Sequence, residues 1–193
     1  AEPIPGVPDK VYSEPNRGLG IIGHSIVGSV QSAIQRFMRT DKTADGRYTD
    51  QAAASSMFIG RKDGGLIQMY PVTASTWTSG GREANTSFWA IEEEGGGPGN
   101  FGEPLTDAQV ETLLRLSGEF EAYTGRKVVR GSTFREHGEV AAQFGYAPTS
   151  CPSGRYARFY EALEGAASQP VTLDDVVRAL GGPEAIREWN AKG

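Results

Sequence analysis

Three side chains that commonly bind zinc are scattered along the chain: His24, His137 and Cys151. They are its two histidines and its single cysteine. His24 follows the apolar run "LGIIG", while the other two lie in a stretch rich in Pro, Gly and Ser that reads as a loop over residues 135–153. Imidazole and thiolate are preferred zinc ligands, and a catalytic site keeps three protein ligands and an open position. The residue types therefore allow a catalytic zinc site, although their separation provides no short-range ligand motif.

Two other interpretations use the same residues. A buried histidine is usually a hydrogen-bonded core residue, and a lone cysteine is usually a small hydrophobe. Alternatively, Cys151 could be a nucleophile at the start of the helix "CPSGRYARFYEAL", with His137 or His24 as its base. The residues alone leave all three possibilities open.

The elements that must position these side chains can be read from hydrophobic periodicity and turn signals. Residues 1–17 carry four prolines and predict an extended arm. The expected elements that follow are a strand ending at His24, a helix in "SVQSAIQRFMR", a hairpin around "KDGG", a strand in "SFWAIEEEG", a capped helix over 106–124 and a helix in "GRYARFYEALEG". This order predicts an α/β fold with a mixed central β-sheet flanked by helices.

The domain organisation follows from the same reading. We expect the arm over 1–17, one catalytic domain over 18–165, and a helical C-terminal tail over 166–193. In the tail, "TLDDVVRALGG" and "PEAIREWN" predict two short helices.

Charge and composition exclude several classes of partner. The net charge is −5 and the sequence has no cluster of Lys and Arg, which disfavours nucleic acid. No apolar run approaches the ~20 residues of a membrane helix, so we expect no membrane insertion. The segment "AEPIPGVPDK" lacks the basic and apolar regions of a signal peptide. We expect a monomer.

Four segments, in order, make residues 18–165 resemble a known family. They are "GIIGHS", "SSMFIGRKDGGLIQMYPVTASTWTSG", "NTSFWAIEEEG" and "REHGEV…TSCPSG". Together they are similar to the zinc-dependent N-acetylmuramoyl-L-alanine amidases of type 2. That family includes phage endolysins of the T7 lysozyme kind and shares its fold with peptidoglycan recognition proteins. The extra Ser153 within the family's "C-P-G" is a minor departure.

The resemblance implies a zinc ion held by His24, His137 and Cys151. The family's catalytic group is either a glutamate, which matches Glu92, or a tyrosine. The tyrosine position matches Ser56, and Met57 replaces the histidine that follows it, so the resemblance favours Glu92.

Other family positions match Thr149 as a second catalytic group, and Trp77 and Asn85 as substrate-binding residues. Strand alternation puts Glu92 on one face with Phe88 and Ala90 and puts Glu93 on the other. The sequence does not say which face looks at the metal.

The implied reaction is hydrolysis of the amide between N-acetylmuramic acid and L-alanine in bacterial peptidoglycan. Glu92 would move the proton and Thr149 would stabilise the oxyanion. We expect the protein to act on the bacterial cell wall. The lack of a visible signal peptide fits a phage lysin released from the host cytoplasm, or a protein from which a segment has been trimmed. The alternative is a recognition module that binds peptidoglycan without cutting it, but in that branch of the family inactivity commonly accompanies loss of the cysteine.

Overall fold

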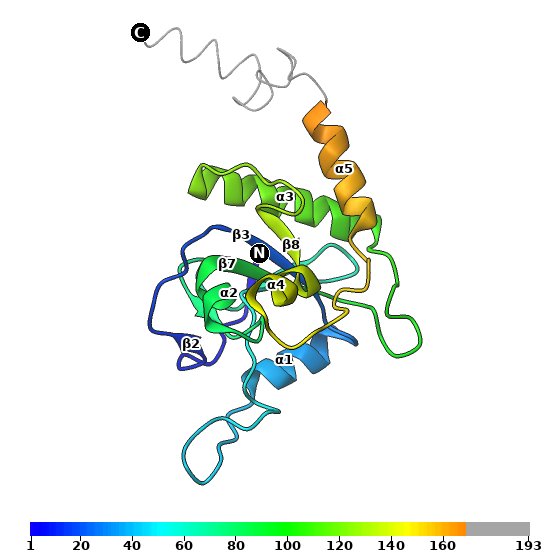
Figure 1. Ribbon diagram of the computed structural model, residues 1–193. Helices are drawn as coiled ribbons and strands as arrows, with labels where there is room; N and C mark the ends of the chain where they lie inside the picture. The colour runs from blue at the N-terminus through cyan, green and yellow to red at the C-terminus, as the bar shows by residue number, and fades with distance from the viewer. Residues whose placement is uncertain (169–193) are drawn as a thin grey trace, which may run out of the picture. The chain divides into compact units, whose positions relative to one another are not determined.

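The computed structural model describes residues 1–168 (Figure 1). Residues 1–161 form one compact unit, and the described part of a second unit, 162–193, belongs to the last helix. The two helices predicted in the tail lie outside the described residues, so the expected boundary near 165 stays a prediction. Among the described helices, none is long and apolar enough to span a membrane.

The described chain contains short strands and five helices. The strands are β1 (Glu2–Pro3), β2 (Val11–Tyr12), β3 (Gly20–Ser25), β4 (Phe58–Gly60), β5 (Leu66–Gln68), β6 (Ser75–Thr76), β7 (Phe88–Glu93) and β8 (Phe134–Glu136). The helices are α1 (Val30–Met38), α2 (Arg82–Ser87), α3 (Asp107–Thr124), α4 (His137–Phe144) and α5 (Ala157–Ser168).

Six of the strands form one mixed sheet in the order β1-β5-β4-β7-β3-β8. β3 pairs in parallel with β7 on one side and β8 on the other, and β7 pairs in parallel with β4. β4 and β5 form the antiparallel hairpin predicted around "KDGG". The predicted α/β class, with a mixed central sheet flanked by helices, is therefore confirmed.

Helices cover both faces of this sheet (Figure 1). On one face Ile22 of β3 packs with Val140 of α4, and α1 packs on the same side of the sheet near β4 and β5. On the other face Trp89 of β7 meets Phe120 of α3, with ring centroids 5.1 Å apart. There Gly23 lets Tyr156 lie against β3, because a Cβ at position 23 would be 2.5 Å from that ring. The carboxyl ends of β3 and β7 are thus held between two helical layers.

Two sequence-based assignments need correction. The predicted loop over 135–153 is wrong in its first half, which contains the end of β8 and then α4. Glu136 and Glu139 form a reciprocal capping box that starts α4, and the Pro- and Ser-rich composition belongs only to the segment after Gly145. The prediction also missed α2, which has only six residues and no side-chain cap.

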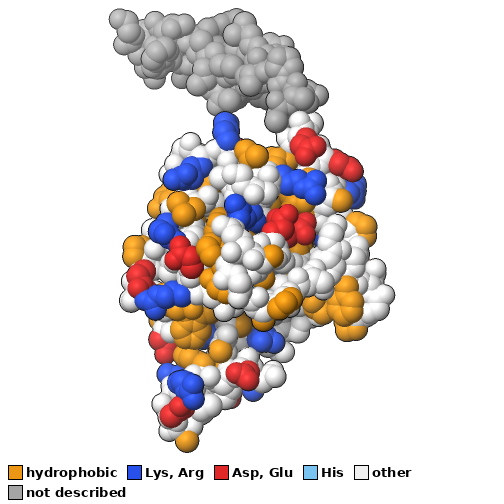
Figure 2. All heavy atoms as spheres, in the orientation of Figure 1, with side chains coloured by type: hydrophobic (Ala, Val, Ile, Leu, Met, Phe, Trp, Pro, Cys, Tyr) orange, Lys and Arg blue, Asp and Glu red, His pale blue; other side chains and the backbone are white. Residues whose placement is uncertain are grey.

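Charged side chains of both signs are scattered over the face of the molecule seen in Figure 2. On the face seen in Figure 2, Lys and Arg are interspersed with Asp and Glu, and no large basic patch gathers there.

β7 carries a buried acid on the face of the sheet that packs against α3. Glu93 is 0% exposed, and its Oε2 accepts a hydrogen bond from Gln109 Nε2 of α3 at 2.8 Å. Its Oε1 has no hydrogen-bond partner among the described residues. Burial raises the pKa of Glu93 from the usual 4.5 to about 8, against the smaller opposing effects of Gln109 and Arg155. The folded protein therefore holds this carboxyl neutral near pH 7.

We predict that Glu93 makes the fold less stable as pH rises. Between about pH 4.5 and pH 8 the unfolded chain loses this proton while the folded chain keeps it, so folding free energy is lost across that window. Glu93→Gln should remove this loss. Its free energy of unfolding should exceed that of wild type by roughly 2–4 kcal/mol at pH 8.5, with a much smaller difference at pH 4.5. Urea unfolding of both proteins at each pH, with saturating zinc, measures the difference.

Glu111→Gln, on the exposed side of α3, is the matched control and should follow wild type at both pH values. A Glu93→Gln protein whose stability relative to wild type does not change with pH would show that this carboxyl is ionised inside the fold.

Candidate metal centre and catalytic site

The three predicted ligands meet at the carboxyl end of β3. His24, His137 and Cys151 each offer a ligand atom, and these atoms lie within 4.8 Å of one another. The histidines meet because β3 and β8 are paired in parallel. Gly23 pairs with Glu136, and a histidine directly follows each of these two residues in the sequence. Their ring centroids are 4.4 Å apart. The two histidines, far apart in the sequence, are thus brought together by parallel strand pairing.

Both imidazoles are held in their neutral form. Burial holds the pKa of His24 well below its usual value, and the adjacent His137 lowers it further. Burial also lowers the pKa of His137, against a hydrogen bond to the Ser79 backbone that raises it. Neutral imidazole is the form that binds a metal ion, so the site is prepared for a cation rather than for two protonated histidines.

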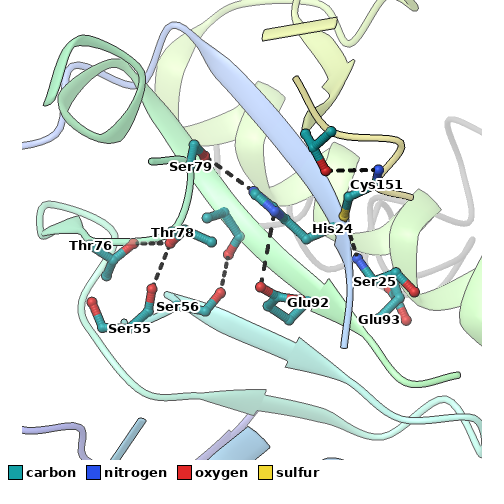
Figure 3. A network of polar contacts seen from close by, with 12 residues as sticks. His24, Ser25, Ser55, Ser56, Thr76, Thr78, Ser79, Glu92, Glu93 and Cys151 are labelled. Atoms are coloured by element: carbon teal, nitrogen blue, oxygen red, sulfur yellow. Dashed lines mark hydrogen bonds and ion pairs between the residues drawn. The ribbon is translucent and has the colours of Figure 1, made fainter. Parts of the chain in front are cut away.

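The loop before α2 orients both histidines. The Ser79 hydroxyl lies 3.2 Å from His24 Nε2 (Figure 3). If Nε2–H donates to that hydroxyl, Nδ1 is the unprotonated nitrogen, and it faces Glu92. Ligating histidines usually engage their second nitrogen in this way, which fixes tautomer and ring orientation. The sequence reading missed this contact of Ser79 with a predicted ligand, because nothing in the polar string "STWTSGG" distinguishes the residue.

Asn85 holds this loop in place. Its side-chain oxygen accepts hydrogen bonds from the backbone N–H groups of Thr78 and Ser79, at 3.2 and 2.7 Å. The residue is only 4% exposed. Asn85 therefore positions Ser79, and its predicted contact with substrate stays a prediction.

Cys151 is tied to the neighbouring elements by its backbone and its sulfur. The Ser25 N–H donates to its Sγ at 3.3 Å, and the Gly138 N–H donates to its carbonyl at 2.9 Å. Burial raises the pKa of the Cys151 thiol to about 12, and the charge of Glu92 adds to this effect. An activated nucleophilic cysteine needs a lowered pKa, whereas a ligand cysteine is deprotonated by the metal itself. The surroundings of Cys151 favour the metal ligand over the thiol nucleophile.

A buried arginine fastens the cysteine loop to the sheet. Arg155, 1% exposed, follows Cys151 closely in the sequence. Its guanidinium donates to Ser25 Oγ at 2.7 Å and to the carbonyls of Glu93, Glu94 and Glu103 at 3.1, 2.7 and 2.6 Å. These bonds use all three guanidinium nitrogens and hold the carboxyl ends of β3 and β7 beside the cysteine. The sequence reading missed Arg155, because its role depends on contacts with distant backbone carbonyls.

Glu92 is the carboxylate on the metal-site face. It pairs in register with His24 across β3 and β7, and its Oε1 lies 4.0 Å from His24 Nδ1 (Figure 3). Its side chain is 14% exposed, and burial raises its pKa to about 8 while the charge of Arg36 lowers it. The question left by strand alternation is thus answered: Glu92 looks at the site and Glu93 looks at the opposite helical layer.

The other residues matched through the family resemblance are Thr149, Trp77 and Ser56. The Thr149 hydroxyl oxygen accepts a hydrogen bond from the Cys151 N–H at 3.1 Å, and the residue is half-buried. The half-buried Trp77 meets Tyr12 and Tyr48 edge-on, with centroids 6.2 and 5.6 Å away. Ser56, at the family's tyrosine position, is fully buried and donates to main-chain carbonyls. Ser56 cannot take the role of the tyrosine hydroxyl.

Solved structures share this fold. The endolysin and N-acetylmuramoyl-L-alanine amidase LysCS from Clostridium intestinale URNW is 17% identical, with a TM-score of 0.57 over 88% of this chain and 95% of that one. A selenomethionine derivative of AmpD is 18% identical, with a TM-score of 0.59 over 84% and 93%. The Staphylococcus aureus hydrolase AmiA, solved with its ligand, is 14% identical, with a TM-score of 0.57 over 94% and 86%.

Sequence comparison identifies the family directly. A search of curated protein sequences gave no match. The sequence profile of the N-acetylmuramoyl-L-alanine amidases, by contrast, matches residues 14–154, which is most of the chain and includes every predicted site residue. The chain therefore belongs to the type-2 N-acetylmuramoyl-L-alanine amidase family.

Proposed function

We propose that this amidase is a zinc enzyme that cleaves the bond between the lactyl group of N-acetylmuramic acid and L-alanine, and that it acts on the bacterial cell wall as a phage endolysin. One observation carries the zinc proposal: His24, His137 and Cys151 present ligand atoms within 4.8 Å of one another. The endolysin proposal is supported by similarity in fold to LysCS.

The donor set fits zinc. Two neutral imidazoles and one thiol make a three-ligand site of the catalytic type. When bound, zinc polarises the scissile carbonyl and acidifies water, and its charge favours the thiolate of Cys151. Ser79 and the Ser25 N–H orient these ligands from outside the metal site.

Glu92 moves the proton in the proposed reaction. Its carboxylate stands beside His24, so it can accept a proton from the attacking water and return it to the amine of L-alanine. A base works best when its pKa is close to the working pH, and burial raises the pKa of Glu92 towards that range.

Thr149 is the proposed donor to the oxyanion. Its oxygen accepts from the Cys151 N–H, which leaves the hydroxyl proton to point elsewhere. That proton can stabilise the negative oxygen that forms when water attacks the carbonyl. Trp77, next to the loop that orients the histidines, is the proposed stacking surface for the sugar or the stem peptide.

The metal claim predicts a loss of zinc on ligand substitution. Wild type should hold about one zinc per chain, while Cys151→Ser and His137→Ala should lose tightly bound zinc and lytic activity together. Metal analysis after dialysis, paired with turbidity of purified cell walls, measures both. Chelation should abolish wild-type lysis and added zinc should restore it.

Ser150→Ala, at the exposed neighbour of Cys151, is the matched control and should keep both zinc and activity. A Cys151→Ser protein that keeps zinc and lysis would contradict the assigned ligand set. Wild type that binds zinc without lysis would point to the recognition module.

The proton-transfer role predicts a separable effect. Glu92→Gln should keep zinc but lower kcat by roughly 10²–10⁴-fold, because the amide cannot accept the proton. The control is Glu94→Gln, at the residue just after β7, whose carboxylate instead accepts from the Lys62 N–H at 2.9 Å. Steady-state hydrolysis of a soluble muropeptide measures kcat for both. Equal kcat in Glu92→Gln and wild type would remove Glu92 from the mechanism.

A further inference from the structure

A cavity of about 210 Å³ opens directly beside Glu92. Four of the residues that line it are apolar: Ile26, Ala33, Phe37 and Ala54. Its one cationic residue is Arg36, on α1. Ser25 and Thr78 complete the lining, so the cavity joins an apolar wall, two hydroxyls, a positive charge and the proposed proton carrier.

Arg36 is available to bind an anion. Within residues 1–168 no carboxylate lies at ion-pair distance from its guanidinium, although other arginines of the chain make such pairs. Its guanidinium donates one hydrogen bond, 3.4 Å long, to the Asp50 carbonyl, at the long limit for such a bond. Its charge is nevertheless felt at Glu92, whose pKa it lowers. An exposed cation with unused donors thus borders the reacting end of the site.

The chemistry of the proposed substrate supplies a matching anion. In the proposed reaction Glu92 returns a proton to the amine of L-alanine when the substrate amide is cleaved. The peptide side of that bond must therefore lie close to the Glu92 carboxylate. The next residue is D-glutamate, whose nitrogen is bonded to L-alanine. Its side-chain carboxyl is bonded to the residue that follows, so its α-carboxylate stays free, a few bonds from the alanine. In some cell walls this group is a free carboxylate, and in others it is a carboxamide.

We propose that this cavity is the subsite for the first two residues of the stem peptide, and that Arg36 recognises the free α-carboxylate of D-glutamate. This inference rests on the proposed function. The alanine methyl packs against the apolar wall, and the guanidinium pairs with the carboxylate.

A pair of soluble muropeptides tests the proposal, identical except that D-glutamate carries a carboxylate in one and a carboxamide in the other. Wild type should cleave the carboxylate form with a kcat/KM roughly tenfold or more higher, as expected for a charge-assisted hydrogen bond. Arg36→Gln should reduce this preference to about twofold or less by losing activity on the carboxylate form alone. Arg36→Lys should keep part of the preference.

The matched control is Arg39→Gln, which removes the same charge from the residue just after α1, where Arg39 pairs with Asp41 outside this cavity. Arg39→Gln should keep the wild-type preference. Calorimetric binding of the γ-amide of L-alanyl-D-glutamate, in which the α-carboxylate is the free carboxyl group, gives a second readout for wild type and Arg36→Gln, and only wild type should bind it measurably.

Three results would overturn the subsite: equal cleavage of both substrates by wild type, an equal loss on both in Arg36→Gln, or the same change in Arg39→Gln. Failure of the proposed function looks different. In that case zinc-loaded wild type would cleave neither muropeptide, whichever group D-glutamate carries, and the subsite would fall with it.

Discussion

The site depends on the parallel pairing of β3 with strands on both of its sides. The register with β7 sets Glu92 beside His24, and the register with β8 brings His137 to the same point. Because side chains alternate between faces along a strand, a slip of one residue in either pairing would turn one of these groups away. Strand register is therefore as much a part of the site as the ligands themselves, and the helical layers on both faces stabilise that register.

The groups behind the sheet hold the strand ends at a cost in stability. Arg155 places a guanidinium in the interior, where its bonds to main-chain carbonyls replace the water it has lost. Glu93 stays neutral by keeping its proton. Tyr156 donates to the carbonyl of His24 at 3.1 Å, so it supports a proposed ligand from the opposite face. Buried polar groups of this kind fit a protein that uses part of its stability to fix a reactive edge.

Sequence reasoning predicts most of the framework because the signals are local. Three such signals each depend on a few adjacent residues: the capping box of Thr106 and Gln109, the "KDGG" turn and the apolar strand before His24. The structure contains all three elements. α4 was missed because the chain leaves the strand and enters a helix without a break at His137. Short segments of that kind take their conformation from packing more than from propensity.

The site was only partly predictable, for a different physical reason. Residue type and family resemblance pointed to the three ligands, which the fold then brings together. The choice between Glu92 and Glu93 required knowing which face of the sheet is closed by α3. Ser79 and Arg155 act through hydrogen bonds to partners far away in the sequence, and no local pattern encodes such contacts.

X-ray absorption at the zinc edge tests the central claim most directly, because it counts the atoms bound to the metal in the loaded protein. Ligation by His24, His137 and Cys151 predicts one sulfur at about 2.3 Å and two imidazole nitrogens at about 2.0–2.1 Å. A shell of nitrogen and oxygen without sulfur, or a protein that retains no zinc to measure, would contradict it.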